Sequence, residues 1–396
     1  MRKLMKNENF YSLLIVLVSL GSLALFQPSC FAATYHITNV DELQAMQNDL
    51  YGDYILDNDI DASETQTWNG GKGFIPIGGN GSFYGSLDGK NYTIQNLYIS
   101  NQRLYFHTGL FRWNKSSAKI TNVHLENVNI TGRSNQAPTG ALVGFNENGT
   151  IENCSIVGGG ITNTGGAFTR EVGGLVGLSQ GGLINKCFVE GATVRINVSG
   201  SGPYAGGLVG RLTIGAQITN SYSTANVVGY RVGGLVGKAE LAALVENTYA
   251  AGAVAGSQSA GGLIGYTSGA TISYSYWDIE TSGQSSSAGG EGKTTAQMMQ
   301  QATFFNWDFN TIWIIDEGTS YPYFGSGASF IDIGLRVYDG TDTVKIACEP
   351  DDNVTSPLRI AKDEKVFGIA LVAMDDPNAT KIRIKTSSGV MALRRY

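Results

Sequence analysis

The chain has 396 residues, a formal net charge of −6 and an isoelectric point near 5.2. This acidic balance argues against nucleic acid or an anionic membrane surface as the partner. Glycine is abundant, with 53 residues, whereas four cysteines are too few for a disulfide scaffold, so stability has to come from a packed core.

The first residues have the pattern of an export signal. A basic start leads to an apolar run over residues 11–26 and then to Cys30-Phe31-Ala32, a small-x-small cleavage site. We expect a signal peptide over residues 1–32 and no membrane segment after its removal. A lipid anchor on Cys30 is the weaker alternative, because the preceding residues are a poor context for acylation. The expected location is extracellular or on the cell surface, with the periplasm as the alternative.

Residues 33–104 are predicted to form the N-terminal cap and the irregular first coils of the repeat structure that follows. Val40–Leu50 has the apolar spacing of a short amphipathic helix, with Asn39 or Asp41 as its N-cap. Such a helix would cover strand edges that otherwise pair with other chains.

Three aspartates in this segment form a weak candidate for a calcium site. Asp57, Asp59 and Asp61 alternate along one predicted strand and would share a face. The segment lacks the glycine and the terminal glutamate of an EF-hand loop, because Ala62 and Trp68 occupy those positions. We therefore expect neither a metal nor a cofactor, with calcium here as the alternative.

Residues 105–280 contain a hexapeptide that recurs at intervals of 27 to 33 residues. Its copies are Thr139–Gly144 (TGALVG), Val172–Gly177 (VGGLVG), Ala205–Gly210 (AGGLVG), Val232–Gly237 (VGGLVG) and Ala260–Gly265 (AGGLIG), preceded by the weaker His107–Phe111 (HTGLF). Each copy is followed by a second alternating apolar and polar run, as in Thr150–Ile156 (TIENCSI), and then by a third short run. Short strands at this period predict a solenoid, specifically a right-handed parallel β-helix with one repeat per coil.

Equivalent positions of the repeats are expected to stack in columns. We predict a structural, inward column of leucines and a ladder of asparagines whose amides bond from coil to coil. These residues are Leu142, Leu175, Leu208, Leu235 and Leu263, and Asn122, Asn153, Asn220 and Asn247. Lys186 interrupts the ladder and Tyr274 ends it. Cys154 and Cys187 occupy equivalent positions, and buried thiols are favoured there over a disulfide.

An aromatic series lies beside these positions on the other side of its strand. It consists of Phe188, Tyr222, Tyr249 and Tyr276. The series is either a wall of the core or a surface ladder that could hold a glycan or a protein partner. Core is the favoured interpretation, and the ligand face is the alternative.

The hexapeptide and the I-x-N-C/S-x-Y segment resemble the GLUG repeat, which is named for its Gly-Leu-any-Gly core. This resemblance covers residues 105–280 and implies a bacterial surface or secreted chain of the adhesin-like kind. The repeat also occurs in non-catalytic parts of immunoglobulin-A-cleaving metallopeptidases. The resemblance carries no catalytic residues over to this chain.

The distribution of acids and histidines argues against a catalytic site. Residues 89–277 contain no aspartate, and the chain has no HExxH motif. Glu152 and Glu246 are equivalent but three coils apart, about 14 Å at about 4.8 Å per coil, which is too far for paired glycosidase carboxylates. His124 occupies the same repeat position as Ser155 and the aromatic series, which favours a structural role.

The remaining sequence is predicted to contain the C-terminal cap and linker over residues 281–327 and a small antiparallel β domain over residues 328–396. Thr295–Thr303 is a candidate short helix, and the aromatics that follow it would plug the last coil or form a sugar-stacking platform.

These features together predict an exported, monomeric, non-enzymatic adhesin-like binding or scaffold protein. Its expected partner is a glycan or a surface protein. The alternative function is that of a β-helical carbohydrate-active enzyme, a polysaccharide lyase or glycoside hydrolase acting on an extracellular polysaccharide.

Overall fold

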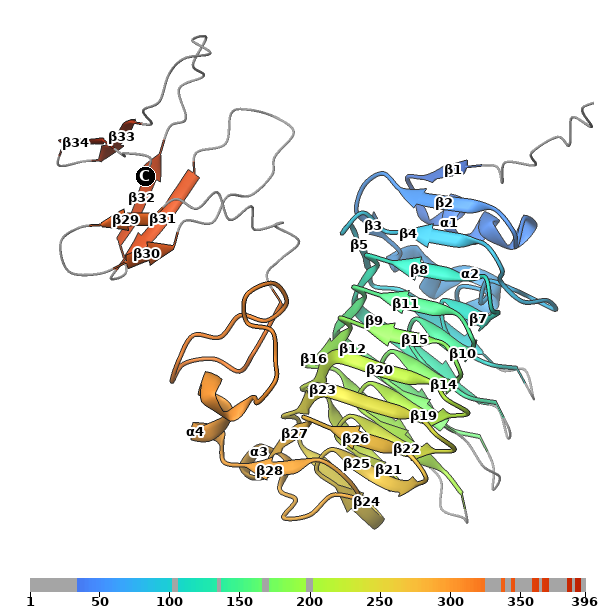
Figure 1. The fold of residues 1–396 in the computed structure, drawn as a ribbon. Helices are drawn as coiled ribbons and strands as arrows, with labels where there is room; N and C mark the ends of the chain where they lie inside the picture. Colours follow the sequence, from blue (N-terminus) through green and yellow to red (C-terminus); the bar gives the residue numbers. More distant parts are fainter. Residues whose placement is uncertain are drawn as a thin grey trace, which may run out of the picture.

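A computed structural model describes residues 34–101, 106–133, 137–165, 171–196 and 202–324, together with the backbone of short strands between 336 and 392. The predicted leader therefore lies outside the described residues. Strands from successive repeats stack in parallel into one elongated solenoid, which confirms the predicted parallel β-solenoid (Figure 1). Its winding sense stays a prediction. None of the helices in the described ranges has the length and apolar character needed to cross a bilayer.

Two faces of the solenoid are built from the strands on either side of the asparagine positions. The first face contains β1 (Thr34–Ile37), β2 (Asp53–Leu56), β4 (Ser86–Asp88), β8 (Lys119–Thr121), β11 (Thr150–Glu152), β15 (Leu183–Asn185), the first parts of β20 (Gln217–Ser223) and β23 (Leu244–Ala250), and β26 (Thr271–Ser273). The second face contains β3 (Ile60–Asp61), β5 (Thr93–Gln95), the first parts of β9 (His124–Gly132) and β12 (Ser155–Asn163), β16 (Phe188–Glu190), the last parts of β20 and β23, β27 (Tyr276–Asp278) and β28 (Glu291–Lys293).

The remaining strands close each coil. The third face contains β6 (Tyr98–Asn101), the last parts of β9 and β12, β13 (Glu171–Gly173), β17 (Thr193–Ile196), β18 (Tyr204–Gly206), β21 (Asn226–Gly233) and β24 (Val254–Gly261). A separate six-stranded sheet contains β7 (Phe111–Asn114), β10 (Val143–Glu147), β14 (Val176–Gln180), β19 (Val209–Thr213), β22 (Val236–Glu240) and β25 (Ile264–Ser268). Every strand of this sheet begins within or just after a hexapeptide.

The hexapeptide leucines form a column through the core. Leu175 donates its backbone N–H to the carbonyl of Leu208 at 2.9 Å, and Leu208 donates to Leu235 at the same distance. All five leucines of the column, from Leu142 to Leu263, are fully buried. Each repeat therefore places one leucine side chain inside one coil, and stacking removes these side chains from water.

The hexapeptide glycines are required by close backbone contact. A Cβ atom on Gly207 would lie 2.1 Å from the carbonyl oxygen of Gly234 in the next coil. A Cβ atom on Gly206 would lie 2.0 Å from the carbonyl oxygen of Val209. Neither glycine has a positive φ, so space rather than backbone freedom excludes a side chain here.

The corner between the first and second faces has a left-handed backbone. Asn122 has φ 56° and Asn153 has φ 52°, and the equivalent residues of later coils share this conformation. Those residues are Lys186, Asn220, Asn247 and Tyr274. Asparagine is the non-glycine residue that best tolerates this region, which explains its recurrence at a tight corner.

The N-terminal helix packs into the core beside the first coils. Helix α1 (Val40–Ala45) continues as the 3₁₀ turn η1 (Met46–Asn48), close to the predicted range. The side chain of Asn39 accepts a hydrogen bond from the backbone N–H of Glu42 at 2.9 Å and is thus the N-cap. Leu43 and Met46 are fully buried in the main core. The other short turns are η2 (Ser63–Thr67), α2 (Trp68–Gly71), α3 (Ile279–Ser282), α4 (Thr295–Met298) and η3 (Gln301–Thr303).

Residues 304–324, which we call the aromatic strap, were predicted to plug the last coil but instead lie along the flank of the solenoid (Figure 1). Trp313 and Phe304 of the strap are buried with Tyr222 and Tyr249 in a second hydrophobic cluster. The hydroxyl of Tyr249 donates a hydrogen bond to the carbonyl of Pro322 at 2.7 Å. The strap therefore covers aromatic rings that project outward from the second face.

The C-terminal segment contains three antiparallel strand pairs. They are β29 (Arg336–Tyr338) with β30 (Thr343–Lys345), β31 (Leu358–Lys362) with β32 (Lys365–Ile369), and β33 (Arg383–Thr386) with β34 (Gly389–Ala392). Their assembly into one small domain stays a prediction.

Candidate functional site

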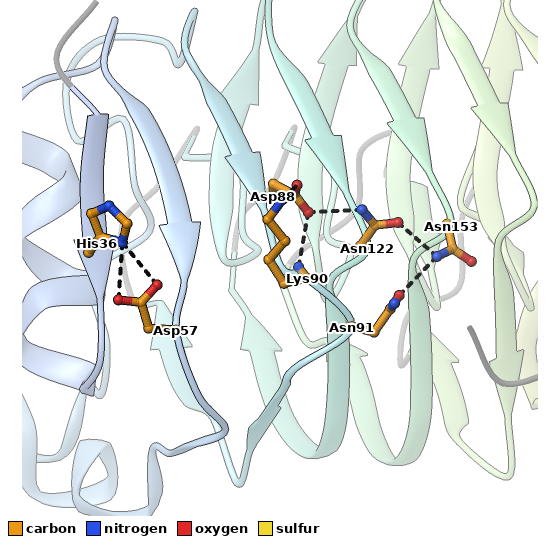
Figure 2. Close-up of polar contacts among 7 residues, drawn as sticks. All are labelled: His36, Asp57, Asp88, Lys90, Asn91, Asn122 and Asn153. Atoms are coloured by element: carbon orange, nitrogen blue, oxygen red, sulfur yellow. Dashed lines mark hydrogen bonds and ion pairs between the residues drawn. The ribbon is translucent and has the colours of Figure 1, made fainter. Parts of the chain in front are cut away.

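The asparagine ladder is continuous only in the first coils (Figure 2). Asn122 donates to Asp88 Oδ1 at 2.8 Å and accepts from Asn153 at 2.8 Å, and Asn153 also donates to Asn91 Oδ1 at 3.1 Å. Further along, Asn220 donates to Asn185, a residue of the first face, and not to the corner residue Lys186. Asn122 and Asn153 thus satisfy each other, whereas the buried Oδ1 of Asn247 has no hydrogen-bond partner among the described residues, so the predicted ladder does not run the length of the solenoid.

The three aspartates of the calcium candidate are separated by a corner of the chain. Strand β2 ends at Leu56, so Asp57 and Asp61 do not lie on one strand as predicted. Asp57 contacts His36 Nδ1 at 2.9 Å (Figure 2). Asp59 instead accepts from the backbone N–H of Thr93, and Asp61 accepts from the backbone N–H of Ser63. The shared-face prediction is wrong because the backbone turns between the strands. Across the described ranges, no group of three His, Cys, Asp or Glu side chains is arranged to hold a metal ion.

The aromatic series forms a stack outside the solenoid core. The rings of Phe188 and Tyr222 are stacked at 5.0 Å, and those of Tyr222 and Tyr249 at 4.8 Å. Tyr222, Tyr249 and Tyr276 are at most 5% exposed because the aromatic strap covers them. The predicted ligand face is therefore wrong for these tyrosines. They form neither a wall of the main core nor an open ladder but the inner layer of a second cluster.

Two other predicted structural positions are those of the cysteines, which lie inside the protein, and of His124, which is half-buried. Cys154 and Cys187 are free and fully buried. His124 Nδ1 lies 2.7 Å from the hydroxyl oxygen of Ser155 in the next coil, and burial lowers the pKa of this histidine. Nothing beside His124 completes a nucleophile and base arrangement with a described carboxylate.

Glutamates on the first and second faces are each held by a different neighbour. Glu152 accepts from Asn185 at 2.8 Å, Glu190 accepts from Tyr222 at 2.6 Å, and Glu246 accepts from Ser273 at 3.1 Å. The strand register places Glu152 and Glu246 three coils apart. At about 4.8 Å per coil this is about 14 Å, beyond the range for a cooperating carboxylate pair.

The outer surface of the six-stranded sheet carries a column that sequence reasoning missed. We call it the outer stripe. In register, one residue from each coil contributes to it: Trp113, Phe145, Leu178, Arg211, Lys238 and Tyr266. All are partly or largely exposed, and Tyr266 is the most exposed at 45%. A signal was present, because from Phe145 onward each is the residue directly after the hexapeptide.

The N-terminal end of the stripe is an aromatic cluster. The rings of Trp113 and Phe145 are stacked at 5.3 Å, and the His107 ring meets both edge-on. Lys115 Nζ lies 4.2 Å from the Trp113 ring centroid, and Glu147 accepts from Trp113 Nε1 at 2.9 Å. Burial lowers the pKa of His107 to about 4, with a further contribution from a nearby arginine, so the imidazole is neutral at physiological pH.

Further along the stripe, one guanidinium lies between two carboxylates. Arg211 Nε donates to Glu240 Oε1 at 2.7 Å, and Nη1 reaches Glu171 Oε1 at 3.4 Å. Burial raises the pKa of Glu171, although the charge and the hydrogen bond of Arg211 act to lower it. Burial also acts on Glu240, but hydrogen bonds from Lys238 and Arg211 outweigh it and lower the pKa of that carboxyl. Tyr204 lies beside them, with Lys238 Nζ 5.3 Å from its ring centroid.

Comparison with protein families relates two parts of the chain to known sequences. Residues 32–158 match the M26 IgA1-specific metallo-endopeptidase N-terminal region, and residues 201–228 match the GLUG motif. The chain is 37% identical over 134 residues to halomucin of Haloquadratum walsbyi and 35% identical over 117 residues to the immunoglobulin A1 protease of Streptococcus sanguinis. These matches cover 31% and 29% of the chain but only 1% and 6% of the two relatives.

Solved structures share the fold at lower identity. A Bacteroides ovatus protein assigned as an immunoglobulin A1 protease has a TM-score of 0.54 at 22% identity, covering 74% of this chain and 93% of its own. A structure described as an IgA1 protease has a TM-score of 0.51 at 16% identity, covering 91% of this chain and 34% of its own. The resemblance to GLUG repeats is therefore confirmed, and the N-terminal part of the solenoid is related to the N-terminal region of M26 IgA1-specific metallo-endopeptidases.

Proposed function

We propose that this chain is an exported, surface-associated binding or scaffold module of the adhesin-like kind, without catalytic activity of its own. The observation that carries the proposal is the arrangement of Glu152, Glu190 and Glu246 on the first two faces, where each carboxylate is held by its own neighbour on a rigid stacked surface. General acid and base catalysis needs two titratable groups that share a reacting atom. A solenoid offers instead an extended surface that binds without an ordering cost.

The family matches support the same proposal. The matched endopeptidase model is the N-terminal region, and its residues 32–158 in this chain contain no HExxH sequence. Surface or secreted proteins carry such regions beside other domains, so we propose that the solenoid presents or holds a partner.

A second candidate function, glycoside hydrolysis, is favoured by one observation. Glu171 and Glu240 converge on Arg211, and their pKa values are shifted in opposite directions, as in an acid and base pair. However, the Arg211 guanidinium occupies the space between these carboxylates, where a glycosidic oxygen would have to lie. The side chain of Glu171 is also only 6% exposed. Binding is therefore the better-supported function.

The test measures adhesion and turnover on the same sample of the exported chain. The chain is applied to surfaces coated with polysaccharides or with extracellular proteins. Its retention on each surface is measured, and the supernatant is analysed for soluble products. We expect retention without product release in the wild type and in Glu152→Gln, and no product release in Glu171→Gln or Glu240→Gln. Release of reducing or unsaturated sugar that disappears in one of these variants would replace the binding proposal with the enzyme.

A further inference from the structure

The outer stripe of the six-stranded sheet has the shape and chemistry of a site for one extended molecule. We propose that it binds a linear, uncharged glycan lying along the solenoid axis, an inference that rests on the proposed binding function.

The length of the stripe suits a chain of several sugar units. Its six residues, from Trp113 to Tyr266, come from six successive parallel strands. Five steps of about 4.8 Å give a stripe of about 24 Å. One step is comparable with the length of one pyranose ring and its glycosidic bond, so successive sugars of a linear glycan would meet successive coils.

Aromatic rings occupy both ends of the stripe. The stacked pair of Trp113 and Phe145 lies at one end. Tyr266 lies at the other, with its ring centroid 6.5 Å from that of Tyr204. Trp113 and Phe145 face each other and Lys115 lies over the Trp113 ring, so a sugar would pack its apolar C–H groups on the outer edges of this pair, and its hydroxyl groups need hydrogen-bonding partners beside the rings. Acids and bases beside the rings, such as Glu147 and Lys238, supply those partners.

The stripe is one side chain wide, which favours a narrow ligand over a folded protein. On one side of the stripe lies a polar column, formed by the residues two positions further along the same strands. It includes Glu147, Gln180, Thr213 and Glu240. On the other side lie His107, Glu171 and Tyr204, which contact stripe residues directly. A stable protein interface buries about 800 Å² on each partner, far more than a single column offers.

The charges of the stripe are paired within the protein. Lys115 forms an ion pair with Glu147, and Arg211 forms ion pairs with Glu171 and Glu240. Lys238 Nζ lies 2.8 Å from Glu240 Oε2. An anionic polymer would have to compete with these carboxylates for the cations. An uncharged ligand uses the remaining hydrogen-bonding capacity without breaking an ion pair, so it fits better.

The experiment measures binding of the exported full-length chain to cellohexaose, maltohexaose, mannohexaose and chitohexaose, with an oligogalacturonate as the anionic probe. We expect at least one neutral hexasaccharide to bind with an affinity that does not depend on salt. Tyr266→Ala and Phe145→Ala should each weaken it about tenfold, as expected for losing one stacked ring. Phe305→Ala is the matched control, because Phe305 is 70% exposed and lies in the strap. Melting temperatures establish that the variants are folded.

Three outcomes would overturn the inference. They are binding of the anionic probe alone with loss at high salt, equal affinities in wild type and both stripe variants, or no binding of any hexasaccharide. If the chain binds no hexasaccharide but adheres to another partner equally well in Tyr266→Ala, the proposed glycan site at the stripe is wrong, whereas the proposed binding function stands. Cleavage of a bound hexasaccharide would instead refute the proposed function.

Discussion

The close contact between stacked coils leaves no room for a side chain at Gly207, the second glycine of its hexapeptide. In Gly207→Ala the new Cβ would lie 2.1 Å from the carbonyl oxygen of Gly234 and 2.2 Å from Ser223 Oγ. Ser223 is fully buried, and the carbonyl belongs to the backbone of the next coil. Neither atom can move away by a simple rotation, so two coils would have to separate locally.

The magnitude follows from this overlap. Inserting one methyl group into a packed interior typically costs about 1–3 kcal/mol. Because backbone is the obstacle on the Gly234 side, we expect the upper end of the range, about 3 kcal/mol. For a domain of this size that corresponds to a decrease in melting temperature of roughly 6 °C or more.

The matched control is Gly160→Ala in strand β12. No heavy atom lies within 4 Å of a Cβ built on Gly160. This substitution should leave the free energy of unfolding unchanged or raise it by up to about 1 kcal/mol, because alanine restricts the unfolded chain. Thermal unfolding followed by circular dichroism compares the two variants. Equal melting temperatures for Gly207→Ala and Gly160→Ala would refute the stacking described here.

Three further predictions concern the interior. The pKa of His107 is lowered from 6.5 to about 4 by burial, so the unfolded chain binds more protons than the folded chain between these values. The free energy of unfolding should therefore fall by about 3 kcal/mol as the pH falls from about 6.5 to about 4. In denaturant titrations, His107→Phe should remove this part of the acid sensitivity. Leu208→Ala should lower the free energy of unfolding by about 2–5 kcal/mol, because it empties a place in the buried leucine column. Leu241 is 57% exposed, so Leu241→Ala should lower it by less than about 0.5 kcal/mol. Equal effects of the two substitutions would contradict the leucine column. Tyr249→Phe should lower the free energy of unfolding by about 1 kcal/mol, because the buried carbonyl of Pro322 loses its hydrogen-bond donor. Hydrogen exchange of the strap amides should become faster, and unchanged exchange would argue against this contact.

The repeated part of the fold could be predicted from sequence because every coil solves the same packing problem. Leu175, Leu208 and Leu235 occupy one repeat position and therefore one place in the stack. The asparagine corner was only partly understood. Amide bonding was expected, but the left-handed backbone is the feature that the repeat coils share, from Asn122 to Tyr274. Lys186 and Tyr274 adopt the same backbone without an amide.

Features that depend on non-repeating contacts could not be predicted. The strap covers Tyr222 and Tyr249 from residues at least 55 positions later, and no periodicity connects the two segments. The corner that separates Asp57 from Asp61 lies in the irregular first coils, where strand ends cannot be read from alternation alone. The outer stripe could have been predicted from the sequence, because stacked hexapeptides also bring the residues that follow them into one column, from Phe145 to Tyr266.

The most direct test of the account is recovery of the ligand after binding. The full-length chain is immobilised, loaded with the neutral hexasaccharides and incubated, and the bound sugar is then eluted and its mass is measured by mass spectrometry. We predict that the eluted sugar has the mass of the intact hexasaccharide and that Tyr266→Ala retains much less of it. Shortened or unsaturated products that vanish in Glu171→Gln or Glu240→Gln would contradict the central claim that this solenoid binds without converting its ligand.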